Sequence, residues 1–311
     1  MIEHKEEWQV QALKMDGIIS RRKIAEALGV KRSTCLDFLR KYSSFVGEKE
    51  MPEDSNTHLV IPDTQVRPSI SLEYLRWIGE YIVRKQPDVI VHLGDHADMP
   101  SLSSYDKGKR SAEGKRVQAD IEAAIEGMQV LLKPLRDFQA QQKADGVKVY
   151  TPRMVILYGN HCDRINRHVD SNPELHGFLS LDDLKYEEMG WETVPFLTPI
   201  VIDGVSYCHY FPNVMTGKPL TGTAQNMLKT IGTSFTMGHR QMLDVAHRQL
   251  PSDGQRQWGL IAGAAYVHEE HYKGFQGNFH WRGVIVKHNV KNGSYDPLFV
   301  SMDWLEKEYG V

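Results

Sequence analysis

Short apolar runs that end abruptly in polar, chemistry-bearing side chains recur along this chain and limit its possible folds. The run "MVILY" stops at Gly159 and is followed by Asn160 and His161. The run "PDVIVHL" stops at Gly94 and is followed by Asp95. Strands that are apolar on both faces are typical of parallel sheets covered by helices, and ligands collect beyond the carboxyl ends of such strands. The pattern therefore predicts an α/β protein with a site at one edge of a sheet.

Strand-like and helix-like segments alternate in the first part of this α/β region. The expected strands are "HLVIPD", "PDVIVHLGD" and "RMVILYGN". Between the first two lies an amphipathic segment, "SLEYLRWIGEYIVRKQ", whose Leu72, Leu75, Ile78 and Ile82 recur at helical spacing. A second helix is expected from about Glu113 to Lys143. This order of strand, helix, strand, helix, strand indicates a parallel sheet.

The second half of the chain contains short strand-like runs that lie close together. They include "PIVIDGVSYCHYF", "TSFTMGH", "WGLIAGAA", "GVIVKHNVKNGSY" and "LFVSM". Asp203–Gly204 and Asn292–Gly293 are dipeptides that favour hairpin turns. We expect these runs to form a second sheet packed on the first, with helices outside.

Residues 1–46 are predicted to form a small helical domain of the helix-turn-helix type. Two short helices joined by a turn at Gly29 match that pattern. Between Ser20 and Lys41 there are seven basic and two acidic residues, a balance of +5 in a chain whose net charge is -3. The predicted DNA contacts are Lys31, Arg32, Ser33 and Thr34. The alternative is a small helical bundle with a solvated charged face.

The domain boundaries follow from composition. Residues 47–56 are polar, charged and contain a proline, so we expect a linker between the helical domain and a larger domain at 57–311. The three cysteines make no disulfide framework, which favours a reducing cytoplasm. No apolar run approaches the roughly 18 residues that span a bilayer, so no membrane association is expected.

Five of the predicted strands end in potential metal ligands. These residues are Asp63 and Gln65, Asp95 with His96 and Asp98, Asn160 and His161, His209, and His239 with Gln241. Carboxylates, imidazoles and amide oxygens without sulfur suit Mn²⁺, Fe, Zn²⁺ or Mg²⁺. A carboxylate such as Asp95 can bridge two ions about 4 Å apart, as in two-metal phosphoryl-transfer sites.

The order and spacing of these strand ends resemble the calcineurin-like metallophosphoesterases. The pattern of that family is D-x-H, GD-x-x-D, GNH-D/E, a lone His and GH-x-H, and this chain has "DTQ", "GDHAD", "GNHC", "CHY" and "GHRQ". The stretches "GNHCDR" and "GNFHWRG" further resemble the bacteriophage subgroup. The resemblance covers roughly residues 57–311. It implies a four-layer αββα sandwich of two mixed sheets and a binuclear metal centre.

The resemblance also implies a role for each site residue. One metal ion would be held by Asp63, Gln65, Asp95 and Gln241, and the other by Asp95, Asn160, His209 and His239. His161 would orient the phosphate and protonate the leaving oxygen, and Asp98 would hold the His161 imidazole and favour its charged form.

This chain departs from the family pattern at two ligand positions of the first metal ion, where it has glutamine. Gln65 and Gln241 replace family histidines, and an amide oxygen is a harder donor than imidazole. The first metal ion should therefore bind more weakly and favour Mn²⁺ or Mg²⁺, with Mn²⁺ expected overall and Zn²⁺, Fe or Ni²⁺ as alternatives. The alternative is a degenerate, inactive site. Cys162 stands where the family has an acid, and a packing role is expected for it.

The substrate prediction depends on the cations near the motifs. Phosphoprotein phosphatases have an arginine after the second motif, where this chain has Met99. The candidates to hold phosphate are Arg67, Lys107, Arg164 and Arg240, each of which is alternatively a solvated surface charge. The basic loop "SLSSYDKGKRSAEGKR" is expected to cover the cleft or contact a polyanion, and "YVHEEHYKGFQGNFHWRG" either stacks bases or is a packed loop.

These features favour a metal-dependent phosphodiesterase or nuclease acting on DNA and oriented by the amino-terminal domain. It would work in the cytoplasm of a bacterial host if a phage encodes it. One alternative is a phosphomonoesterase or cyclic-nucleotide phosphodiesterase acting on small molecules. Another is a DNA-binding protein with a vestigial metal site.

Overall fold

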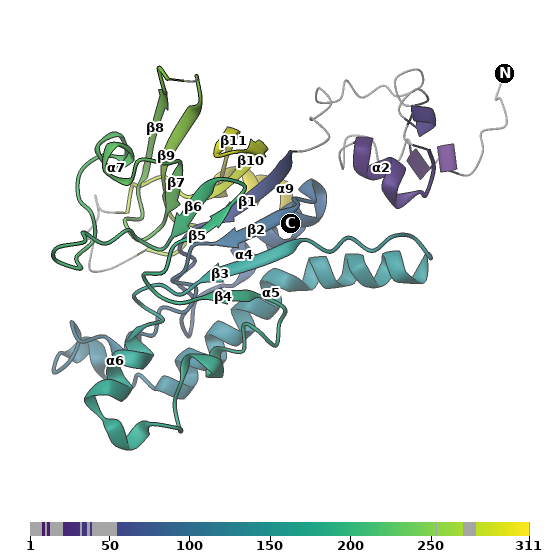
Figure 1. Cartoon of the computed structure of the whole chain (residues 1–311). Coiled ribbons are helices and arrows are strands. Elements are labelled where there is room, and N and C mark those ends of the chain that lie inside the picture. Colours follow the sequence, from purple (N-terminus) through teal and green to yellow (C-terminus); the bar gives the residue numbers. More distant parts are fainter. Residues whose placement is uncertain are drawn as a thin grey trace.

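Figure 1 shows the chain as a computed structural model. The structure describes residues 8–9, 11–12, 21–31, 33–35, 38, 55–252, 254–269 and 278–310. Within these residues the protein is a mixed α/β structure built on two mixed sheets, as the strand and helix patterns predict.

The first sheet has six described strands in the order β11-β10-β1-β2-β3-β4. Their bounds are β1 (Asn56–Ile61), β2 (Val89–His92), β3 (Arg153–Leu157), β4 (Glu192–Val194), β10 (Gly283–Lys291) and β11 (Ser294–Ser301). Strands β1 to β4 pair in parallel, with Leu59 opposite Ile90 and Ile90 opposite Met154. Strand β10 is antiparallel to both β1 and β11. The carboxyl ends of β1, β2 and β3 therefore meet at one edge.

The second sheet has five described strands in the order β5-β6-β7-β9-β8. Their bounds are β5 (Ile200–Ile202), β6 (Val205–Cys208), β7 (Phe235–Met237), β8 (Leu243–Gln249) and β9 (Arg256–Ala262). The three central strands are parallel, and the two edge strands are antiparallel to their neighbours. The ends of β6 and β7 can thus supply side chains to one place.

Alternation along the strands of the first sheet divides the core between its two faces. Leu59 and Ile61 point to a buried cluster that includes side chains of α4 (Glu73–Lys85) and α5 (Val117–Ala144). Val60 points to a second cluster that contains Tyr207 and Leu260 of the other sheet. A side-chain period of two makes successive residues face opposite sides of a strand, so this sheet is buried on both faces.

The second sheet is covered on its far side by α7 (Ala224–Ile231). Met227 and Leu228 of this helix share a buried cluster with Phe235, Met237 and Ile261 of the sheet. Helix α9 (Met302–Tyr309) contacts α4, and α6 (Arg164–Ser171) follows β3. This succession of helices, sheet, sheet and helix is compatible with the expected four-layer sandwich (Figure 1).

Several local expectations differ from the structure. The hairpin of β10 and β11 turns at Asn292–Gly293 as predicted, but it joins the first sheet through β1 instead of the second sheet. A turn signal identifies a hairpin from local chemistry, whereas its partner strand depends on contacts that are distant in sequence. Helix α5 begins at Val117 and not near Glu113, because the residues before it form turns and the short 3₁₀ helices Pro100–Leu102 and Arg110–Ala112. Helices α6, α7 and α9 and the strands β4 and β8 were not predicted.

The amino-terminal part is described over short stretches only. Helix α2 (Arg21–Ala27) ends at a turn in which Gly29 has a φ of 63°, and helical residues resume at 33–35. Ile24 and Ala25 are buried with Cys35 and Phe38. The predicted contacts Lys31, Ser33 and Thr34 are exposed. Arg32 and most of the predicted linker, residues 47–54, lie outside the described residues.

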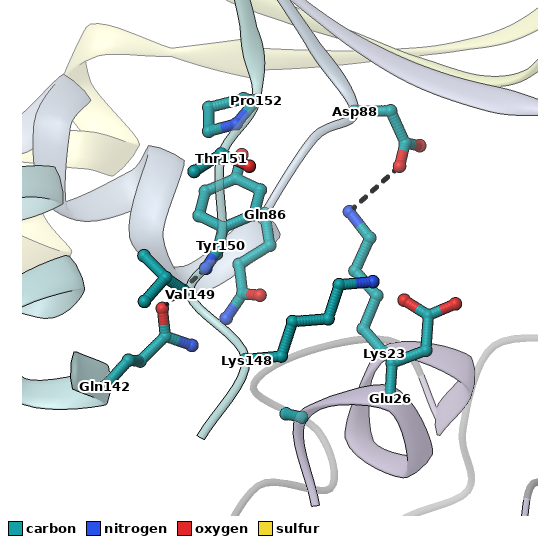
Figure 2. A pocket seen from close by; sticks show the side chains of 11 residues that line it. Lys23, Glu26, Gln86, Asp88, Gln142, Lys148, Val149, Tyr150, Thr151 and Pro152 are labelled. Atoms are coloured by element: carbon teal, nitrogen blue, oxygen red, sulfur yellow. Dashed lines mark hydrogen bonds and ion pairs between the residues drawn. The ribbon is translucent and has the colours of Figure 1, made fainter. Parts of the chain in front are cut away.

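Helix α2 contacts the larger domain at the amino-terminal end of the first sheet. The Lys23 Nζ lies 3.4 Å from Asp88 Oδ1 and 5.5 Å from the centroid of the Tyr150 ring. Figure 2 shows Lys23 and Glu26 facing a hollow that is also lined by Lys148 and Tyr150. In the part of the chain that the structure describes, no helix is long and apolar enough to cross a membrane.

Candidate metal centre

Three side chains from the ends of three strands meet at one point. Asp95 follows β2, His209 follows β6 and His239 follows β7. One potential ligand atom from each lies within 4.8 Å of the others, and Asp95 and His209 are buried. The two sheets therefore both contribute to this centre, as the motif order predicts.

Asn160, which follows β3, lies between the two imidazoles. Its Oδ1 is 2.9 Å from His209 Nε2 and 2.7 Å from His239 Nδ1. The other nitrogen of His209, Nδ1, is 2.8 Å from the carbonyl oxygen of Leu93 and must donate a proton to it. This backbone bond fixes the imidazole so that Nε2 faces Asn160 and the Asp95 carboxylate, whose Oδ2 is 3.3 Å away.

The electrostatic environment of Asp95, His209 and His239 suits a cation between these side chains. Burial opposes a charge on His209, but Asp95 outweighs it and raises the pKa of His209 to about 9. The same interaction lowers the pKa of Asp95 below its ordinary value, against the effect of burial. Burial, aided by His209, lowers the pKa of His239 to about 4. Nε2 of His209 thus faces Asn160 Oδ1 and Asp95 Oδ2, and both oxygen atoms can bind a cation. A metal ion can take the place of the proton on Nε2.

Asp63 supplies a carboxylate next to these residues. Its Oδ1 accepts the backbone N–H of His239 at 3.1 Å, while Oδ2 is buried without a hydrogen-bond partner. Burial raises the pKa of Asp63 to about 6. A buried carboxylate oxygen without a partner is costly unless a cation or proton satisfies it, so the donor set fits a divalent metal ion.

The two glutamines of the predicted first metal position are buried, but their amides differ in environment. The backbone N–H of Gln65 donates to the Asp95 carbonyl at 2.9 Å, and its side-chain Nε2 has no hydrogen-bond partner. Gln241 Oε1 accepts the hydroxyl of Tyr266 at 3.0 Å. The structure therefore assembles the second predicted ligand set more completely than the first.

The backbone around the centre is held in unusual conformations. Among the described residues, five non-glycine positions in the motifs have left-handed φ values between 45° and 65°: Gln65, Asp95, Met99, His239 and Gln241. Such conformations cost about 1–3 kcal/mol at most positions and persist where the surroundings impose them. Their concentration at the strand ends is typical of a functional site.

Two glycines allow backbone and carboxylates to approach closely. A Cβ on Gly159 would lie 2.0 Å from Asp95 Oδ1, and one on Gly238 would lie 2.4 Å from Asp63 Oδ1. No side chain fits at those distances. The glycines of "GNH" and "GHR" are therefore required by the position of the two carboxylates.

His161 and Asp98 form a pair at the edge of the centre. Nδ1 of His161 lies 2.6 Å from Asp98 Oδ1, and its Nε2 lies 3.9 Å from Asp95 Oδ2. Burial opposes charge on His161, but Asp95 and Asp98 outweigh it and raise the pKa of the imidazole. The backbone N–H of His161 also donates to Asp95 Oδ1 at 2.8 Å. The pair thus has the geometry of a carboxylate that orients a histidine.

The four predicted phosphate-binding cations lie in different places. Arg164 donates to the Asp98 carbonyl at 2.7 Å and lies 3.4 Å from His161 Nε2. Arg67 donates to Asp98 Oδ2 at 3.3 Å. Arg240 instead donates to the carbonyl of Gly222, and Lys107 is exposed on the loop before α5. The structure brings the first two cations to the His161 pair and not the other two.

A buried histidine chain behind the centre was missed in the sequence. The N–H of Gly94 donates to His92 Nδ1, so His92 Nε2 donates to Thr64 Oγ1 at 3.1 Å. The Thr64 hydroxyl then donates to His96 Nδ1 at 2.9 Å, and His96 Nε2 donates to the Ala124 carbonyl. Burial lowers the pKa of both imidazoles. His96, which is one of the potential ligands in the sequence, therefore supports the strand ends from behind.

Tyr266 and Cys162 are also clearer in the structure than in the sequence. Tyr266 lies beyond β9, where Ala264 pairs with Asp63; it opens the stretch "YVHEEHYKGFQGNFHWRG", but no role at the site was predicted for it. Cys162 is buried in the core between the first sheet and its helices, where burial raises the pKa of its thiol to about 12. Its side chain therefore packs, as expected.

Comparison with known proteins links the chain to bacteriophages. It is 26% identical over 212 residues to "Gene 54 protein" of Mycobacterium phage L5, which covers 66% of this chain and 77% of the relative. It is 26% identical over 196 residues to "Gene 54 protein" of Mycobacterium phage D29, covering 61% of this chain and 69% of the relative. Both relatives are phage proteins, which supports a phage origin for this chain. No protein-family model matches it.

Proposed function

We propose that this protein is a metal-dependent phosphoesterase of the calcineurin-like type that hydrolyses phosphodiester bonds in DNA. The observation that carries the proposal is the convergence of Asp95, Asn160, His209 and His239 beside the His161–Asp98 pair. The proposal includes the four-layer αββα arrangement for residues 57–311 and a helix-turn-helix at residues 1–46.

Each of two divalent ions would have its own ligand set. Asp95, Asn160, His209 and His239 would hold one ion, and Asp63, Gln65, Asp95 and Gln241 would hold the other. When bound, such ions act as Lewis acids toward phosphate oxygens and lower the pKa of water. Because the set with Asp63, Gln65 and Gln241 contains only carboxylate and amide donors, we propose Mn²⁺, with Mg²⁺ as the next candidate.

His161 would act as the general acid in this reaction. The carboxylate of Asp98 accepts a hydrogen bond from Nδ1–H of His161, which leaves Nε2 as the nitrogen that faces the centre. The raised pKa of His161 keeps a proton available for the oxygen that leaves phosphorus. Asp98 is held in turn by the guanidinium groups of Arg67, which donates to its carboxylate, and of Arg164, which donates to its carbonyl. Arg164 lies 3.4 Å from the imidazole and Arg67 contacts its partner Asp98, so both would assist in binding a phosphate.

A DNA substrate is supported by two features. Met99 is buried, so the position that carries the phosphate-gripping arginine in protein phosphatases is occupied by a core side chain. The exposed Lys31 and the basic residues around it offer a polyanion contact. We therefore propose DNA as the partner, in the cytoplasm of a bacterial host. Cleavage should weaken steeply with added salt, because phosphate contacts release counterions.

The test is a substrate panel for the full chain loaded with Mn²⁺, Mg²⁺, Zn²⁺ or Ni²⁺. The substrates are bis-p-nitrophenyl phosphate, p-nitrophenyl phosphate, cyclic nucleotides, and single- and double-stranded DNA. His161→Gln should lose DNA cleavage, and His176→Ala, which changes an exposed histidine in the turn after α6, should not. Hydrolysis of cyclic nucleotides without DNA cleavage would replace DNA by a small-molecule substrate. No turnover of any ester with any metal would refute the proposal.

A further inference from the structure

Several hydrogen bonds within the loop between Asp98 and α5 converge on Asp106. The carboxylate of Asp106 accepts the Ser111 hydroxyl at 2.9 Å and the Lys115 Nζ at 3.0 Å. The backbone N–H of Lys109 donates to the Asp106 carbonyl at 2.9 Å. Asp106 therefore links the middle of residues 103–115, which we name the basic loop, to the end that precedes α5. The exposed side chains of the loop project from a backbone that carries these bonds.

The basic loop exposes an aromatic ring among positive charges. Tyr105 is 72% exposed, and the Nζ of Lys109 lies 3.5 Å from its ring centroid. Lys107 and Arg110 are also exposed, and in the part of the chain that the structure describes neither makes an ion pair. The basic loop contains four basic and two acidic side chains, a balance of +2. Since the chain as a whole has a net charge of -3, this loop is locally suited to a polyanion.

The basic loop starts next to the proposed catalytic pair. Asp98, which holds His161, is followed by Met99 and the 3₁₀ helix Pro100–Leu102 that leads into the loop. Arg164 at the start of α6 donates to the carbonyl of Asp98, and Ser101 N–H donates to Asp120 of α5 at 2.8 Å. Figure 1 shows the segment between β2 and α5 beside α6. The loop is thus anchored to the elements that position His161.

An exposed tyrosine beside lysines is suited to one nucleic-acid strand. Base–aromatic stacking requires an unpaired base whose face is free, and basic side chains bind the phosphates on either side. Lys109 covers one face of Tyr105, so the other face remains for a base. In a duplex the bases are already stacked on one another, and only the phosphates would contact the loop.

We propose that the basic loop binds a single strand of DNA and leads it to the metal centre. Tyr105 stacks on an unpaired base, and Lys107, Lys109 and Arg110 bind the flanking phosphates. This inference rests on the proposed function, because it assigns the substrate of that site as single-stranded DNA or the unpaired end of a duplex. In this proposal Lys107 still binds a phosphate, as predicted, but on the basic loop and not beside His161 and Asp98.

The test compares binding and chemistry in matched variants of the full chain. Tyr105→Leu keeps an apolar side chain and removes the stacking surface. A triple variant, Lys107→Gln, Lys109→Gln and Arg110→Gln, removes the charges. Its control carries the same charge change on exposed lysines of α5 and α9, as Lys133→Gln, Lys143→Gln and Lys307→Gln. Fluorescence anisotropy measures binding to a labelled oligothymidylate and to a hairpin duplex with equal numbers of phosphates.

We expect Tyr105→Leu to weaken binding of the oligothymidylate by roughly 5- to 100-fold, the range of one base–aromatic stack. Binding of the duplex should change little. The triple variant should weaken binding of both DNAs more than its control does. Equal effects of Tyr105→Leu on both DNAs, or no effect on either, would overturn the inference, as would equal losses in the two triple variants.

Hydrolysis of bis-p-nitrophenyl phosphate separates this inference from the proposed function. The ester has no neighbouring nucleotide for the basic loop to bind, so all these variants should hydrolyse it at close to the wild-type rate. If the wild type turns over this ester while Tyr105→Leu binds the oligothymidylate normally, the inference fails and the phosphoesterase proposal stands. If the wild type hydrolyses no ester while Tyr105→Leu selectively loses the single strand, the loop's role in binding stands and the phosphoesterase proposal fails.

Discussion

Replacing Gly159 by alanine should displace the Asp95 carboxylate, which belongs to the candidate metal centre. The added Cβ would lie 2.0 Å from Asp95 Oδ1 and 2.7 Å from Asp95 Cγ. Carbon and oxygen atoms that are not bonded to each other rarely approach within about 3.4 Å, so the carboxylate must move by about 1 Å or more. That movement would also break the 2.8 Å bond from the His161 N–H to Asp95 Oδ1.

The magnitude follows from these two effects. Forcing an extra carbon into a packed site costs about 1–3 kcal/mol, and a lost hydrogen bond to a charged acceptor costs about 1.5–3 kcal/mol. We therefore expect the free energy of unfolding to fall by about 2.5–6 kcal/mol. For a domain of this size the melting temperature should fall by roughly 5 to 20 °C. Mn²⁺ affinity should fall by at least about 100-fold, since a ligand itself is displaced.

The assay is differential scanning calorimetry together with isothermal titration of Mn²⁺ into metal-free protein. Gly146→Ala is the control: it lies in a turn after α5 with a φ of 67°, and a Cβ there meets nothing within 4 Å. It should cost about 1 kcal/mol for the left-handed backbone and leave Mn²⁺ binding intact. If Gly159→Ala has the stability and the Mn²⁺ affinity of this control, the close approach of Gly159 and Asp95 does not organise the centre.

Three further predictions concern protonation and support of the site. His161→Gln should lose most of its rate on esters with poor leaving groups and less on nitrophenyl esters, as measured by steady-state kinetics; equal losses would mean that His161 only positions phosphate. Tyr266→Phe removes the hydroxyl that holds Gln241 and should weaken Mn²⁺ binding about 10- to 100-fold in titration calorimetry, whereas unchanged affinity would show that this bond does not orient the amide. Burial lowers the pKa of His58, despite its bond to Asp203, so the unfolded state takes up the proton first and stability should be lost as the pH falls below about 6.5. His58→Gln should flatten the dependence of the urea unfolding free energy on pH, and an unchanged slope would contradict this account.

The sequence predicted those parts of the fold that local chemistry controls. The helical spacing of Leu75, Ile78 and Ile82 corresponds to the buried face of α4. The turns at Asp203–Gly204 and Asn292–Gly293 join antiparallel pairs, as turn-forming dipeptides do. In each case the signal lies within a few residues of the structure that it produces.

Other features depended on contacts between distant segments. Strand β10 pairs with β1, and its Lys287 is fully buried between the sheets, with Nζ 4.4 Å from the ring centroids of Tyr207 and Tyr295. A lysine in the run "GVIVKHNVK" would be placed in solvent by its type alone. Burial lowers its pKa well below the ordinary value. Only the packing of one sheet on the other decides that environment.

The candidate metal centre shows the same division between local and tertiary information. By itself, the sequence determined which side chains stand at the strand ends, because ligand type and spacing are local and three of the five ends are marked by a glycine. The tertiary structure decided which nitrogen of His209 faces Asn160, that Arg164 reaches Asp98 while Arg240 binds Gly222, and that Tyr266 contacts Gln241. These are distances between atoms from different strands, and they are set only when the two sheets pack.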